Sequence, residues 1–226
     1  MEISSYGGTC LRFKGREGVV VADAYGAFVG PTGRGLTADI CTYSHAENQA
    51  PLRLDAAQRD PLPRGDGIKV PTSLAGAFLL DSAGEFEVHE ILVTGVRTFR
   101  DDQKGVLRGS NTVFVYELDG LHAAHLGEIG HLLSEDTIDV VGTVDIVCVP
   151  IGGGLPAARA AELVTQLAAK LVVPMTIDGD GSSAEMALFM HEMSVQQAEP
   201  AAKLTVTASS LPAETTVVVL EVRGRS

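Results

Sequence analysis

The 226-residue chain lacks the features of several specialised classes of protein. Its longest apolar stretches, such as Ile146–Ile151, fall far short of the roughly 20 residues needed to cross a bilayer. The segment Met1–Ser5 has no basic region followed by a long apolar run, so it does not resemble a signal peptide. We therefore expect no membrane partner and a cytoplasmic location.

Cysteine and basic residues are both scarce. The three cysteines, Cys10, Cys41 and Cys148, lie in apolar contexts without CxxC spacing. This argues against a zinc knuckle and a disulfide framework, and it favours buried free thiols. Lys and Arg number 17 against 29 Asp and Glu, and the net charge of -12 would repel a phosphate backbone. We expect no nucleic-acid partner.

The chain contains enough apolar residues to form a full hydrophobic core. Hydrophobic types make up 45% of the chain and charged types 20%, which fits one globular domain over residues 1–226. The stretch from Pro51 to Pro71 departs from this pattern, with four prolines and little periodicity. We interpret it as a long loop insertion at about residues 51–71.

Short segments rich in β-branched and aromatic residues predict strands through most of the chain. They cover Thr9–Phe13, Val19–Ala22, Ile40–Thr42, Val88–Thr94, Thr112–Leu118, Val144–Ile151, Leu171–Pro174, Leu204–Thr207 and Thr216–Val222.

Helical patterns are fewer and fall late in the sequence. Apolar residues at helical spacing predict a helix over Pro156–Leu171. Ser134 can cap a second helix ending at Val141, and a third is expected over Ser183–Met193. Many strands with few helices between them indicate an α/β fold in which two sheets are covered by helices.

Two short motifs fail when their spacing is checked. Gly152, Gly153 and Gly154 follow a strand and precede a helix, but neither GxxxxGK[ST] nor GxGxxG is present, so a tight connection is favoured over a nucleotide site. His191-Glu192 begins like a zincin motif, yet Val195 stands where its second histidine would be.

Histidines concentrate in one short region, between residues 122 and 131. His122, His125 and His131 surround Glu128 in the sequence and could form a metal site if the chain brought them together. Partly buried structural roles are the more common alternative for histidine.

Several segments in order resemble the metallo-β-lactamase superfamily, and specifically its UlaG-like branch. The resemblance covers nearly the whole chain and implies the αββα sandwich of that superfamily, with two mixed sheets flanked by helices. The matching segments are Tyr6–Cys10 (family Y-G-H-S-C), Val20–Asp23 (V-V-T-D), Ser82–Glu87 (G-P-G-E-Y-E), Gly109–Thr112 (G-x-N-T) and Val147–Gly153 (a strand ending P-x-G-G).

The family's metal ligands are mostly replaced at the matching positions. Of the three histidines and the aspartate in the S-H-x-H-x-D-H signature, which matches Ser44–Ala50, only His45 is kept, and Gly8 replaces the histidine of Y-G-H-S-C. The remaining matched ligand positions are Glu47, Gln49, Ala50, Arg100 (family T-F-H-D), Glu128 (H-L-G-D) and Thr176 (I-P-M-H). Asp23, His125 and His131 are expected to neighbour this site.

A dinuclear zinc site needs several imidazoles and carboxylates around each ion. At the matched positions, His45, Glu47 and Glu128 could bind one ion, next to the fixed positive charge of Arg100. The second ion would have too few ligands. The Arg100 guanidinium stays charged and can bind two carboxylates with its planar fork. We therefore expect a cluster of Arg100, Glu47 and Glu128 in place of the metal; the alternative is that Arg100 points into solvent.

These substitutions favour a pseudoenzyme with a binding, assembly or scaffolding role, without a cofactor, acting with a protein partner or as a homo-oligomer. A metal-dependent hydrolase with one Zn or Mn held by His45, Glu47, His125 and Glu128 is the alternative. A third reading is binding of a small molecule in the vacated cleft without catalysis.

Overall fold

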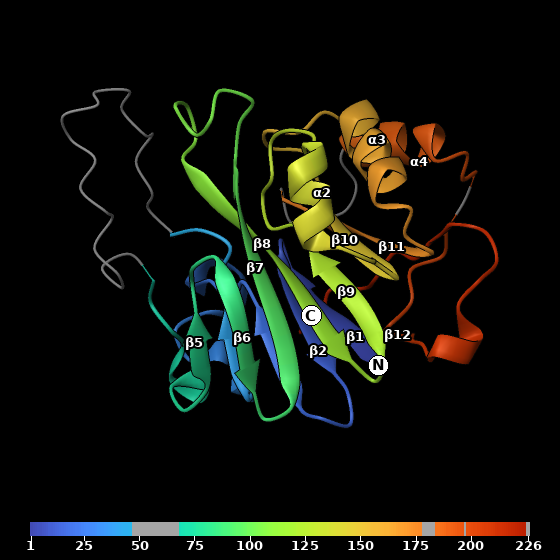
Figure 1. The fold of residues 1–226 in the computed structure, drawn as a ribbon. Helices are drawn as coiled ribbons and strands as arrows, with labels where there is room; N and C mark the ends of the chain where they lie inside the picture. Colours follow the sequence, from blue (N-terminus) through green and yellow to red (C-terminus); the bar gives the residue numbers. More distant parts are fainter. Residues whose placement is uncertain (47–67, 178–183, 197, 225–226) are drawn as a thin grey trace.

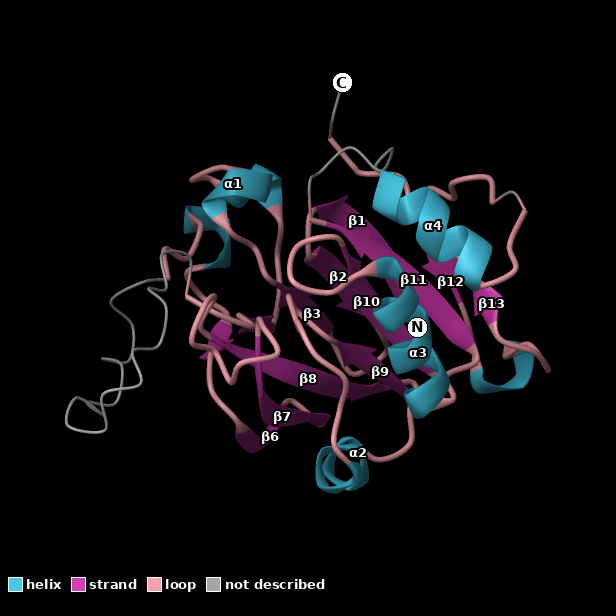
Figure 2. Cartoon of the chain, turned by 90° about the horizontal axis from the view of Figure 1, so that it is seen from above, coloured by secondary structure: helices cyan, strands magenta, loops and turns pink. Residues whose placement is uncertain are grey.

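The computed structural model describes residues 1–46, 68–177, 184–196 and 198–224. Two sheets lie face to face, and helices flank them (Figures 1 and 2). This is the αββα sandwich that the sequence predicted. Most of the expected loop at 51–71 lies outside the described residues.

The first sheet has six strands in the order β12-β1-β2-β3-β4-β5. They are β1 (Glu2–Gly7), β2 (Cys10–Lys14), β3 (Val19–Ala22), β4 (Ile40–Thr42), β5 (Phe78–Leu80) and β12 (Leu204–Thr205). The second has seven, in the order β13-β11-β10-β9-β8-β7-β6. These are β6 (Gly84–Val88), β7 (Ile91–Phe99), β8 (Ser110–Leu118), β9 (Leu121–His125), β10 (Ile146–Ile151), β11 (Leu171–Thr176) and β13 (Thr216–Val217).

The helices cover the outer faces of both sheets (Figure 2). The second sheet is covered by α2 (Glu135–Val141), α3 (Ala157–Leu167) and α4 (Ala184–Glu192), and the first by the short α1 (Gly26–Val29) and two 3-10 turns, Gly33–Gly35 and Thr72–Leu74. No helix in the described ranges is long and apolar enough to cross a membrane.

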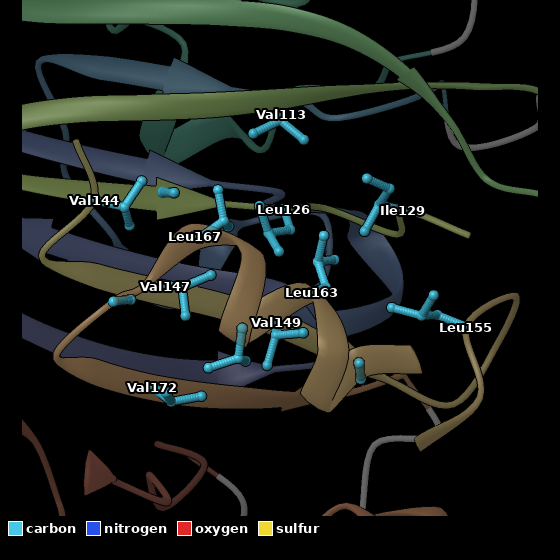
Figure 3. Packing of buried hydrophobic residues seen from close by; sticks show 14 of the residues in the cluster. Val113, Leu126, Ile129, Val144, Val147, Val149, Leu155, Leu163, Leu167 and Val172 are labelled. Carbon is cyan, nitrogen blue, oxygen red and sulfur yellow. The ribbon is translucent and has the colours of Figure 1, made fainter. Parts of the chain in front are cut away.

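The strands in the middle of the second sheet are buried on both faces, which explains their continuous apolar sequences. Along β10, Ile146 and Cys148 point into the layer between the sheets, whereas Val147 and Val149 pack under the helices. Figure 3 shows Leu163 and Leu167 of α3 over these valines. Because β10 pairs in parallel with both β9 and β11, all three strands end at the same edge of the sheet.

Two expected elements differ clearly from those observed. The expected strand Val88–Thr94 is two strands, β6 and β7, joined by a tight turn in which His89 and Glu90 both have positive φ. Neither residue signals such a turn, for which Asn and Gly are typical. The helix expected to run to Leu171 ends at Leu167, because Ala168 turns left-handed and Leu171 begins β11.

The packing under α3 gives a direct test of the core. Leu163 is completely buried, so Leu163→Ala should lower the free energy of unfolding by about 2–5 kcal/mol through lost burial and a residual cavity. Leu188 on α4 is 52% exposed, and Leu188→Ala should change the stability by less than about 0.5 kcal/mol. Urea denaturation of both variants measures the difference; equal effects would contradict this packing.

Candidate functional site

Polar side chains from both sheets meet where their strands end. Asp23 follows β3 and His45 lies just beyond β4, and these two strands are parallel neighbours. Arg100 follows β7 and Glu128 follows β9, at the corresponding edge of the second sheet. The two edges come together where His45 Nε2 lies 3.8 Å from Glu128 Oε1.

Arg100 forms an ion pair with Glu128. Its Nε donates to Glu128 Oε2 at 3.0 Å, and its Nη2 donates to the same oxygen. Its Nη1 donates to the carbonyl of Arg108 at 3.2 Å, so all three guanidinium nitrogens are held. The side chains of Arg100 and Glu128 are only 16% and 11% exposed. Arg100 therefore does not point into solvent.

Glu128 is positioned from behind by Asn111 of β8. The Asn111 side-chain carbonyl accepts the Glu128 N–H at 3.0 Å, and its amide donates to Leu126 O and Thr98 Oγ1. Gly127 has a φ of +60°, and a Cβ there would lie 2.5 Å from the Asn111 oxygen. The G-x-N-T segment thus supplies a positioning residue to which the sequence alone assigned no role.

Two hydroxyl groups hold the ring of His45. Tyr25 donates its hydroxyl hydrogen to the His45 carbonyl at 2.7 Å, and Ser44 donates its own to Asp23 Oδ2 at 2.7 Å. His45 Nδ1 lies 2.9 Å from Ser44 Oγ and 3.2 Å from the Tyr25 hydroxyl. When both hydroxyl hydrogens are donated in these directions, the contacts favour the tautomer in which Nδ1 carries the ring's hydrogen and Nε2 faces Glu128 without one.

The surroundings favour a neutral His45. Burial lowers the pKa of His45 below its usual range; Arg100 and His125 act in the same direction, whereas Asp23 and Glu128 oppose it. Burial also raises the pKa of Tyr25 well above its usual range, so the Tyr25 hydroxyl keeps its hydrogen.

Asp23 and His125 lie beneath this ring and are completely buried. The Asp23 carboxylate accepts from Ser44 N and Ser44 Oγ, both at 2.7 Å. His125 Nε2 donates to the Thr9 carbonyl at 2.8 Å and lies 4.0 Å from Asp23 Oδ2. Because Nε2 donates to the Thr9 carbonyl, His125 links β9 to the segment between β1 and β2 and does not present this nitrogen to Glu128.

The possible metal site of His122, His125 and His131 does not form, because the structure separates these histidines and gives each a structural contact. His122 and His125 are an odd number of positions apart on β9 and so point to opposite faces. His122 lies beside Asp145, with 3.5 Å between Nδ1 and Oδ2. His131 Nε2 accepts from Phe99 N and its Nδ1 donates to Leu132 O, so it pins its own loop to the end of β7.

Gly8 lies under the ring of Phe28 from α1. A Cβ on Gly8 would be 2.0 Å from Phe28 Cζ, and Gly8 has a φ of +55°. A histidine, the family residue of this motif, would not fit there unless Phe28 moved.

Two glycines let three loops meet around the backbone of Arg100. A Cβ on Gly130 would lie 2.2 Å from the Arg100 carbonyl oxygen, and one on Gly154 would lie 2.3 Å from it. Gly154 belongs to the run of three glycines after β10. Its role is this close backbone approach, as the tight connection expected from the sequence requires.

Asp101 organises the loop that joins β7 to β8. Its carboxylate accepts backbone N–H groups from Gln103, Gly105, Leu107 and Arg108 at 2.6–3.0 Å. Burial opposes ionisation of Asp101, but these four donors outweigh it and lower its pKa below the usual range. The loop places Arg108, whose Nη2 is 4.0 Å from Glu128 Oε2.

The described side chains fit a metal ion poorly. Glu47, Gln49 and Ala50 lie outside the described residues, so the Glu47 part of the expected cluster is not described. Thr176 stands at the end of β11, where the family has histidine. Within residues 1–46, 68–177, 184–196 and 198–224, no three His, Cys, Asp or Glu side chains are arranged to hold a metal. Glu128, a carboxylate at this edge, is paired with Arg100.

Comparison with protein families identifies the chain as a member of the beta-lactamase superfamily, since the model of its domain matches residues 2–176. The search of curated proteins finds no match.

Solved structures agree with this assignment. A candidate Zn-dependent hydrolase of the metallo-β-lactamase superfamily from Thermotoga maritima is 25% identical, with a TM-score of 0.70 and 97% of each chain covered. A metal-dependent hydrolase candidate from Parabacteroides distasonis is 12% identical, with a TM-score of 0.57 and coverage of 97% of this chain and 93% of that one. An isothiocyanate hydrolase from Delia radicum gut bacteria is 13% identical, with a TM-score of 0.59 and coverage of 92% and 100%. The last two show the fold alone.

The Asp101 loop should make stability depend on pH. A carboxyl group whose pKa is lowered on folding stabilises the fold above its unfolded pKa of about 3.9, and this contribution is lost as the pH falls through the lower folded value. Asp101→Asn should therefore cost about 1.5–3 kcal/mol at pH 7, and the difference from the parent should shrink below about pH 4. Urea denaturation across this range measures it.

Asp102, the exposed neighbour, provides the control. Asp102→Asn should change stability by less than about 0.5 kcal/mol at neutral pH. A loss in Asp101→Asn that stays constant from pH 7 to pH 3 would contradict the role of its charge.

Proposed function

We propose that this protein is a degenerate member of its superfamily, similar to the UlaG-like branch, in which an ion-paired cluster stands in place of the dinuclear metal centre. Its function would be non-catalytic, as a binding, assembly or scaffolding protein. The observation that carries the proposal is the pairing of Arg100, at a matched ligand position, with Glu128 at another.

The charge of Arg100 supports this reading. A guanidinium cannot lose its proton within the range in which proteins are folded, so it cannot become a metal ligand. A metal ion bound through Glu128 Oε1 would lie beside this fixed positive charge, because Arg100 donates twice to Oε2 of the same carboxylate. Glu47, if it reaches the guanidinium, would complete the pairing expected from the sequence.

The retained fold supports a role in recognition. Catalysis would need ligands that the matched positions do not supply, whereas the loops around the sheet edge still form a surface that can bind a partner. We propose a second copy of the chain or another protein as that partner.

A second candidate is a hydrolase with one metal ion. It is supported by His45, whose contacts favour a hydrogen on Nδ1 and whose Nε2 faces Glu128. Hydrogen bonding of the remote ring nitrogen is how proteins orient a histidine ligand. Glu47 would supply a further ligand, and the metal would share the Glu128 carboxylate with Arg100.

Zinc titration distinguishes the two candidates. We expect the parent protein to bind no stoichiometric zinc, and the combined variant Glu47→His, Gln49→Asp, Ala50→His, Arg100→His, Glu128→Asp, Thr176→His to bind two ions per chain. Arg100→His alone should restore little, because the shell stays incomplete. Calorimetric titration and elemental analysis measure binding.

One ion per chain in the parent would support the mononuclear hydrolase and overturn the non-catalytic proposal. If the combined variant folds but binds zinc no better than the parent, the residue correspondence with the family is wrong.

Removal of the guanidinium tests the pairing itself. Arg100→Ala leaves the largely buried Glu128 without its partner, and it should cost about 3–5 kcal/mol at neutral pH, less if water enters. The matched control is Arg16→Ala, which removes an ion pair to Asp119 from an arginine that is 82% exposed, and its cost should be much smaller because solvent screens the pair. Chemical denaturation compares them, and equal losses would contradict an organising role for Arg100.

A further inference from the structure

A cavity of about 350 Å³ lies beside the cluster and is not used by the proposal above. It is bounded by the loop between β7 and β8, the turn Gly130–Leu132 and the beginning of α3. All the residues that line it belong to the described part of the chain. Gly130 and Gly154, packed against the Arg100 carbonyl, are part of its lining.

Two arginines contribute to the wall of this cavity. Arg108 comes from the β7–β8 loop and Arg159 from the first turns of α3, and their side chains are 37% and 57% exposed. Both guanidinium groups therefore remain accessible to a ligand. Two arginines at one cavity are notable in a chain with 17 basic and 29 acidic residues.

The acidic groups around these two arginines hold them only weakly. Glu128 is bound by Arg100 through two donors, while Arg108 approaches the same carboxylate only to 4.0 Å. Arg159 pairs with Glu162 at 3.0 Å, an exposed contact three positions along the helix that holds it weakly. Asp101 and Asp102 also line the cavity. The Asp101 carboxylate is directed to four backbone donors, whereas the exposed Asp102 carboxylate is an acidic group with which a bound anion would compete for the arginines.

The rest of the wall is largely apolar. Leu155 is buried, Leu132 is partly buried, and Leu107 is 55% exposed at the cavity. Both ring nitrogens of His131 are already engaged, Nε2 by the Phe99 N–H and Nδ1 by the Leu132 carbonyl. The beginning of α3 contributes little to anion binding, because Glu185 already accepts the Ala157 N–H at 3.1 Å.

We propose that this cavity binds a small organic acid, with its carboxylate between Arg108 and Arg159 and its apolar body against Leu107 and Leu132. A guanidinium pairs with a carboxylate through two parallel donors, and apolar contact adds affinity in proportion to the buried area. Such a ligand would be the small molecule of a non-catalytic binding protein. The cavity does not depend on metal, so its test is independent of zinc binding.

Hexanoate is the probe, with two matched controls. Hexan-1-ol has the same apolar chain without the charge, and acetate has the charge without the chain. Titration of the full chain at low salt, followed by backbone amide NMR shifts, should give a Kd for hexanoate at least about tenfold below those of both controls. The shifts should centre on Gly130, Gly154 and Leu107, and added salt should weaken binding.

Two variants decide whether the arginines are responsible. Arg159→Gln should weaken hexanoate about tenfold and leave hexan-1-ol unchanged, whereas Arg16→Gln, far from the cavity, should change neither. Arg159 is the decisive position because it has no contact with the Arg100–Glu128 pair, so loss of folding in an Arg108 variant would not obscure the result. Hexanoate that binds no more tightly than hexan-1-ol, or that is unaffected by Arg159→Gln, overturns the proposal.

Discussion

The packing around Arg100 is the constraint on which the candidate site depends. Its carbonyl oxygen lies against two glycines from different loops, its N–H donates to the Gly109 carbonyl at 3.1 Å, and its guanidinium binds Glu128. The residue therefore joins the ends of β7, β9 and β10 through both backbone and side chain. Any change in how Glu128 is held must be accommodated by this tightly packed junction.

A second group of contacts fixes the opposite side of the site. Asp23 holds Ser44, and Ser44 and Tyr25 fix the orientation of His45. These contacts also connect the ends of β3 and β4, so they stabilise the fold whether or not the His45 ring binds a ligand. A well-oriented His45 is therefore only weak support for metal binding, because the contacts that orient it also stabilise the fold. The ion pair of Arg100 with Glu128 is the stronger argument, and it speaks against a metal.

The layered fold could be predicted from the sequence because its signals are local and numerous. The strands Val19–Ala22 and Ile40–Thr42 have the predicted bounds, and Ser134 caps α2 by accepting the Thr137 N–H. The turn at His89 and Glu90 could not be predicted, because its backbone conformation is imposed by pairing between β6 and β7 rather than by residue type.

The site was only partly predictable for a related reason. A resemblance of motifs can align Arg100 and Glu128 with ligand positions, and the structure brings these two together. The motifs cannot show which group forms a hydrogen bond with each ring nitrogen of a histidine. These hydrogen bonds distinguish the role of His45 from the roles of His125 and His131. Asn111, Tyr25 and Arg108 were missed because their contacts arise between strands distant in the sequence.

The arrangement of charge connects the proposed loss of metal with the proposed ligand. In a dinuclear site the positive charge would lie at the centre, on the ions, surrounded by carboxylates and imidazoles. In the described part of this chain the cation at the centre is Arg100, already paired with Glu128, and Arg108 lies farther out with a much weaker contact. Two accessible guanidinium groups, those of Arg108 and Arg159, thus stand at the wall of the neighbouring cavity rather than at the sheet edge. A fixed guanidinium there can attract and orient an anion, but it cannot activate water as a bound metal does. That difference is the physical basis for proposing recognition rather than hydrolysis as the function of this chain.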